Sequence, residues 1–90
     1  MLKLPAILMH DTATSCLTEM LSAARAETTT SVAVDASALV RFDSTALAVL
    51  LELRRTVLQL GKTLSLQGVS PRLTDLARLY GIAELLPAQA

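Results

Sequence analysis

The segment from Ser44 to Leu60 constrains the fold of this 90-residue chain more than any other. Good helix-forming residues fill it, and Gly61 follows at the place where helices commonly end in a left-handed conformation. At about 100° per residue, one face of this helix is apolar, as in a helix that packs on a sheet. That face comprises Ala46, Val49, Leu50, Leu53, Val57 and Leu60. The pattern therefore predicts a long core helix.

Strand-like and helix-like segments alternate along the whole chain. Residues 2–9 are apolar except Lys3, and Pro5 predicts a strand near a sheet edge because proline cannot donate a ladder hydrogen bond. Asp11 and Thr12 are candidate caps for a first helix, and Ser70 is one for the last. This alternation predicts one α/β domain. The expected elements are a strand at 2–9, a helix at 14–26, strands at 32–36 and 63–68, helices at 44–60 and 71–80, and a short turn at 84–86.

Composition argues against several classes of function. Eight basic and eight acidic side chains balance, and Phe42 and Tyr80 are the only aromatic residues, so binding to nucleic acid is not expected. Cys16 is the only cysteine, which excludes an internal disulfide and a thiolate zinc site. No apolar run approaches the roughly 20 residues of a membrane-spanning helix, and no signal peptide is evident. We therefore expect a soluble, cytosolic protein without direct membrane insertion.

The long helix carries more apolar surface than a single core contact needs. Leu47, Leu51 and Leu58 extend its apolar arc to about 200°, with Arg54 among them, whereas about 100° suffices for docking on a sheet. Two interpretations follow. Either this shoulder packs under a neighbouring loop or helix, or it is an exposed apolar patch, with Arg54 as a charged anchor, for another protein.

Candidate chemical groups do not form a catalytic pattern. His10, Asp11 and Cys16 lie close in sequence, but Cys16 falls on the apolar face of the first helix, where a cysteine is usually a small buried hydrophobe. Asp35 and Asp43 have no accompanying acid, base or metal partner, so a turn or capping role is expected. The three glycines match no phosphate-binding pattern. We expect no catalytic residue, cofactor or metal site.

The triplet Asp43, Ser44 and Thr45 is predicted to start the long helix. Either the Asp43 carboxylate or the Ser44 hydroxyl can accept a hydrogen bond from a first-turn amide, a contribution of about 1 kcal/mol. A helix N-terminus also tolerates a phosphate, so Ser44 is a candidate phosphorylation site. The added charge of about −2 would disturb an apolar partner at Leu47 and Leu51, one turn away.

The run VDASALVRFDSTALAVLLELRR resembles the centre of a STAS domain, the module of sulfate transporters and anti-sigma-factor antagonists. Asp35 and the sequence Asp-Ser-Thr-Ala-Leu at 43–47 match the family pattern, except that Ala46 replaces the usual glycine. LQGVSPRLTDLARLYG is similar, more narrowly, to the MlaB subfamily, the STAS subunit of the Mla phospholipid-transport ABC system. The resemblance covers nearly the whole chain from Leu2 onward.

This resemblance implies a small mixed β-sheet with helices packed mainly on one side. STAS domains generally open with a strand hairpin, whereas one strand is predicted here, so the chain is either a minimal variant or starts after a missing first strand. The implied function is that of a non-catalytic cytoplasmic subunit, peripheral to the inner membrane, which binds and stabilises or regulates an ABC-transporter ATPase. The alternative is an anti-sigma-factor antagonist that binds a kinase-like anti-sigma factor and is released by phosphorylation of Ser44. The implied partner-binding residues are Asp43, Ser44, Thr45, Leu47, Leu51 and Arg54.

Overall fold

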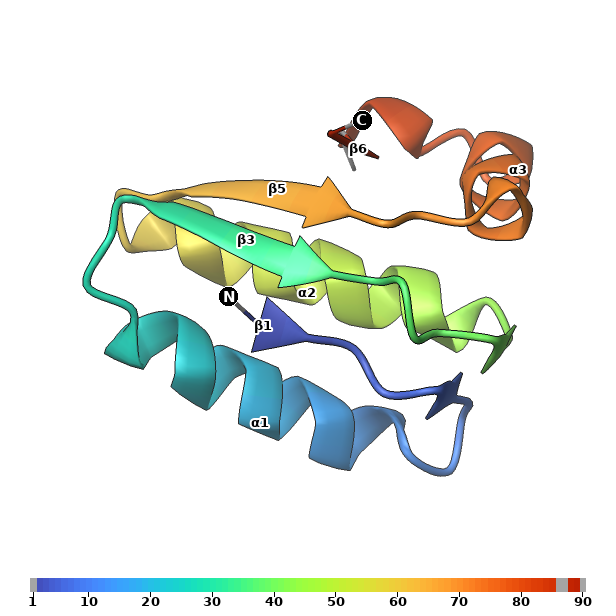
Figure 1. The fold of residues 1–90 in the computed structure, drawn as a ribbon, viewed down its shortest axis with the longest axis horizontal. Coiled ribbons are helices and arrows are strands. Elements are labelled where there is room, and N and C mark those ends of the chain that lie inside the picture. Colours follow the sequence, from blue (N-terminus) through green and yellow to red (C-terminus); the bar gives the residue numbers. More distant parts are fainter. Residues whose placement is uncertain (1, 86–87, 90) are drawn as a thin grey trace.

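A computed structural model describes residues 2–85 and 88–89 of the chain (Figure 1). Helices and strands alternate as the sequence predicts, which confirms the α/β class. The elements are β1 (Leu2–Lys3), β2 (Ile7–Leu8), α1 (Ala13–Ala26), β3 (Ser31–Asp35), β4 (Arg41–Phe42), α2 (Thr45–Gln59), β5 (Thr63–Gln67), α3 (Pro71–Leu79), the 3-10 turn η1 (Ala83–Leu85) and β6 (Ala88–Gln89).

Four strands form the main sheet in the order β1-β3-β5-β6, and β2 pairs with β4 in a smaller one. Every pairing among the described strands is parallel. Over these strands the sheet is thus parallel, and not mixed as the family resemblance implied. A helix connects each strand of the main sheet to the next, and such a crossover returns the chain in the same direction. β1 lies at the sheet edge, as Pro5 predicts.

Helices α1 and α2 run alongside each other and pack against the strands (Figure 1). Side chains alternate along β3, where Val32 and Val34 are fully buried while Ser31 is exposed, so one face of the sheet is covered by the helices. Leu50 and Leu53 of α2 are also fully buried in the same core cluster. Burying each of these leucines contributes about 2 kcal/mol. This core holds the N-terminal turn of α2 in a defined position.

Both predicted helix-boundary signals after residue 60 are present. Gly61 has a φ of +75°, the left-handed conformation that ends α2. The Ser70 hydroxyl accepts a hydrogen bond from the amide of Leu73 at 3.2 Å, which caps α3. Leu60, predicted to face the core, is 42% exposed because α2 ends at Gln59 and Leu60 leaves the helical face.

The N-terminal part of the chain differs most from the prediction. Residues 2–9 form two short strands, β1 and β2, because the chain bends around Pro5 and pairs first with β3 and then with β4. β4 itself was not predicted. The Thr12 hydroxyl bonds to the backbone of Met9 and does not cap α1. The predicted turn at 84–86 is η1 at residues 83–85, and Leu86 lies outside the described residues.

Candidate functional site

The Asp43-Ser44-Thr45 triplet connects β4 to α2, and Asp43 provides its helix-starting contact. The Asp43 carboxylate accepts a hydrogen bond from the Thr45 amide at 2.9 Å. Ser44 occupies the N-cap position, but its hydroxyl makes no capping hydrogen bond, and the residue is exposed. Of the two caps that the sequence allows, the structure thus uses Asp43. The Ser44 hydroxyl remains available to another molecule.

Asp43 carries a full negative charge at neutral pH. Hydrogen bonds from the side chain and backbone of Thr45 hold the pKa of Asp43 below its ordinary value of 3.8, with smaller contributions from His10. The carboxylate is therefore a fixed anion beside the exposed Ser44 hydroxyl.

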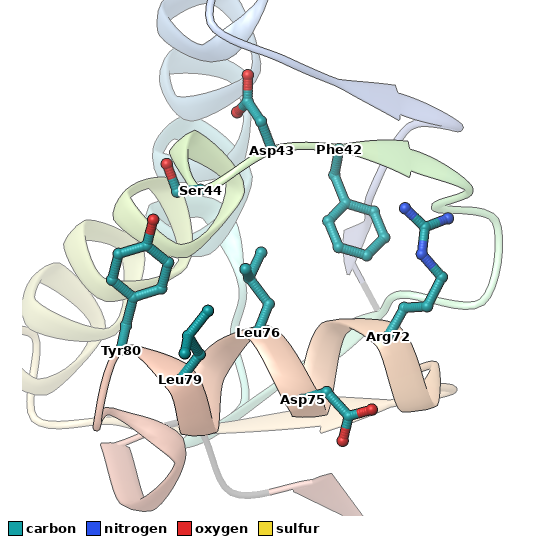
Figure 2. Close-up of a pocket in the computed structure, with 8 residues that line it drawn as sticks. All are labelled: Phe42, Asp43, Ser44, Arg72, Asp75, Leu76, Leu79 and Tyr80. Carbon is teal, nitrogen blue, oxygen red and sulfur yellow. The ribbon is translucent and has the colours of Figure 1, made fainter.

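A hollow of about 430 Å³ separates this turn from α3 (Figure 2). Ser44 and Tyr80 line it, and both residues also line a second hollow of about 300 Å³ along α2. The first hollow is completed by Phe42, Asp43, Arg72, Asp75, Leu76 and Leu79, and the second by Leu47, Ala48, Leu51 and Ile82. Ser44 and Tyr80 therefore stand between two adjoining depressions of the surface.

A third hollow, of about 300 Å³, lies on the other flank of the same helical turn, between α1 and α2. Thr45 and Ala48 line it from α2, and Leu17 lines it from α1. The first turn of α2 is thus a ridge with a depression on each side.

The structure divides the predicted apolar shoulder of α2. Leu47 is only 3% exposed, so its placement on an exposed patch was wrong; it packs in the core and reaches only the floor of the second hollow. Leu51 is half-buried and lines that hollow. Arg54 is half-buried and lines none of the three hollows, whereas Leu58 is 45% exposed further along the helix. Core packing thus explains Leu47, and a partner contact remains available at Leu51.

Helix α3 also contributes to this surface, which the sequence pattern does not predict. Leu79 is 79% exposed, and Tyr80, which shares the helical spacing of the buried Leu73 and Ala77, is 56% exposed. Across the hollow, the Arg72 guanidinium lies 5.1 Å from the centre of the Phe42 ring and donates a hydrogen bond to the Val40 carbonyl at 3.3 Å. Both aromatic residues of the chain line this hollow, a pairing that only the tertiary structure makes visible.

The other chemical candidates have structural roles. Cys16 is buried, and this burial, followed by the nearby charge of Glu19, raises the pKa of its thiol, so the reactive thiolate is disfavoured. Asp35 accepts a hydrogen bond from the Ser37 amide at 2.9 Å, which confirms the predicted turn role. Among the described residues, no helix is long and apolar enough to cross a membrane.

A family model identifies the family of this chain, and solved structures show the same fold. Residues 1–87 match the family model described as MlaB, STAS domain, and the chain therefore belongs to the STAS domain family. The fold is similar to a STAS domain protein, described as an anti-sigma-factor antagonist, from Planctomyces limnophilus, with a TM-score of 0.79, 19% identity, and coverage of 96% of this chain and 77% of that chain. It is also similar to the anti-sigma factor antagonist SpoIIAA in its unphosphorylated form, with a TM-score of 0.74, 16% identity, and coverage of 98% and 76%. No curated protein matches the sequence significantly.

Proposed function

We propose that this STAS domain is a non-catalytic docking subunit that binds its partner through the N-terminal turn of α2. This proposal rests on the Ser44 hydroxyl, which is exposed, makes no capping hydrogen bond and lies on a ridge between hollows. Apolar surface next to a few polar groups is typical of the centre of a protein interface. Ser44, Thr45 and Leu51 form the contact, while Asp43 fixes the turn and Leu47 supports it from the core.

The partner that we propose is the ATPase subunit of an Mla-type phospholipid-transport ABC complex. Two observations support this choice: the matching family model is the MlaB one, and the run with the narrower resemblance forms α3, which faces the α2 turn across the largest of the three hollows. In this role the domain stabilises or regulates the ATPase in maintaining lipid asymmetry of the outer membrane. It would reside in the cytoplasm, held at the inner membrane through its partner.

Co-purification with the ATPase tests this proposal. Leu51→Lys places a charge in the second hollow, so we expect about tenfold weaker binding to the ATPase. Leu58→Lys is the matched control, since Leu58 is an exposed leucine on the same helix that lines none of the hollows. Binding of Leu51→Lys at full strength, with a normal fold, would show that the partner docks elsewhere.

The second candidate is an anti-sigma-factor antagonist regulated by phosphorylation of Ser44. The two solved structures named above are described as anti-sigma-factor antagonists, and the exposed Ser44 hydroxyl is accessible to a kinase. This candidate requires a kinase-like anti-sigma factor that binds the domain and transfers phosphate from ATP to Ser44, after which binding is lost. Mass spectrometry of the domain after incubation with that kinase and ATP separates the two candidates, since the Mla candidate needs no modification.

A further inference from the structure

We propose that the hollow between the first turn of α2 and α3 receives an apolar side chain of the partner that is flanked by arginine or lysine residues. This inference rests on the proposed docking function and extends the contact surface to α3. It adds Leu79 and Tyr80 as anchors and Asp75 as a charge contact, none of which belongs to the surface predicted from the sequence.

The inner wall of the hollow is apolar. Leu76 points from α3 toward α2, Leu79 lies next to it, and the Tyr80 ring lies beside Ser44 (Figure 2). Phe42 forms the opposite wall. A volume of about 430 Å³ accommodates a large side chain, and covering the highly exposed Leu79 and Tyr80 removes apolar surface from water, which favours binding.

The charges around the hollow favour a basic flank on the partner. Asp43 and Asp75 lie on opposite rims, and their carboxylates point outward from the hollow (Figure 2). Asp75 has only a weak intramolecular partner, because its 3.8 Å pair with Arg78 joins two side chains that are 73% and 70% exposed. Arg72, the one cation among the described residues that line the hollow, already stacks on Phe42 and donates to a backbone carbonyl. A cation at either rim thus meets one carboxylate, whereas an incoming anion meets no uncommitted cation among the described lining residues.

Affinity measurements with the purified ATPase subunit of an Mla-type transporter test the inference. We expect Tyr80→Ala and Leu79→Ser each to weaken binding about tenfold, since both remove exposed apolar anchors without opening the core. Asp75→Lys should weaken binding by a similar factor of about ten through like-charge repulsion. Matched controls are Leu85→Ser, an exposed leucine outside the hollow, and Glu19→Lys, an exposed carboxylate on α1. Both controls should bind as the wild type does.

The outcomes separate this inference from the function on which it rests. If Leu51→Lys weakens binding but Tyr80→Ala and Leu79→Ser do not, docking at α2 stands and the α3 contact is refuted. If Asp75→Lys binds as well as or better than the wild type, the partner's flank is not basic. If no variant binds differently from the wild type, the docking surface itself is wrong. Self-association that Leu79→Ser abolishes in size-exclusion chromatography would show that a second copy of this chain occupies the hollow.

Discussion

Among the glycines with a left-handed backbone conformation, Gly68 should be the one whose replacement by alanine destabilises the domain most. Gly68 has a φ of +67°, where an alanine costs about 1 kcal/mol. A Cβ at this position would also lie 2.8 Å from the Cβ of Ser37 and 3.1 Å from its Cα and backbone nitrogen. None of these atoms can rotate away, so the loop after β3 must shift, at a cost of about 2 kcal/mol. The expected loss in free energy of unfolding is about 3 kcal/mol.

Gly61→Ala is the matched control for this prediction. Gly61 has a similar φ of +75°, but a Cβ there would meet no atom within 4 Å, so only the conformational cost of about 1 kcal/mol remains. Thermal unfolding followed by circular dichroism should show a melting temperature about 15 °C lower for Gly68→Ala and about 5 °C lower for Gly61→Ala. Equal losses for the two variants would refute the close approach of the loops after β3 and β5.

Three further predictions concern stability. Lys62→Met should lower the free energy of unfolding by about 1 kcal/mol in urea, with ATPase affinity unchanged, because the Lys62 ammonium donates to carbonyl oxygens at the end of α1. Ser70→Ala should also cost about 1 kcal/mol in urea, because the Leu73 amide loses its cap. Hydrogen bonds from Thr45 hold the pKa of Asp43 below 3.8, so the Asp43 carboxylate stabilises the fold above that pH. The advantage of wild type over Asp43→Asn in free energy of unfolding should therefore shrink as the pH falls through the lower pKa of the folded state. An advantage that persists in acid, or unchanged stability of Lys62→Met or Ser70→Ala, would contradict these roles.

Local patterns in the sequence predicted the elements with strong periodicity or clear end signals. The apolar face of α2 and Gly61 located that helix to within one residue at each end, and Ser70 marked the start of α3. The strand β4 was not predicted, because two residues are too few to show an alternating pattern. The sequence pattern predicts one strand over residues 2–9, because apolarity does not reveal that the chain changes pairing partner around Pro5.

The candidate site was predicted only on its α2 side. The Asp-Ser-Thr triplet marked the turn, since a helix start has a local signature. The burial of Leu47 and the exposure of Tyr80 depend on where α3 lies relative to α2, and a helical wheel of either helix contains no such information. Tyr80 has the helical spacing of the buried Leu73 and Ala77, yet it lines a hollow between α3 and α2.

The affinity of Ser44→Glu for the Mla-type ATPase tests the central claim most directly. Ser44 is exposed at the start of α2 and makes no capping hydrogen bond, so a glutamate should leave the fold intact and add charge to the ridge between the hollows. Ser15→Glu is the matched control, since Ser15 is an exposed serine in the first turn of α1 that lines none of the hollows. We predict binding about tenfold weaker for Ser44→Glu, because its carboxylate would lose water at the apolar contact, and unchanged binding for Ser15→Glu. Wild-type affinity in a folded Ser44→Glu variant would contradict docking at this turn.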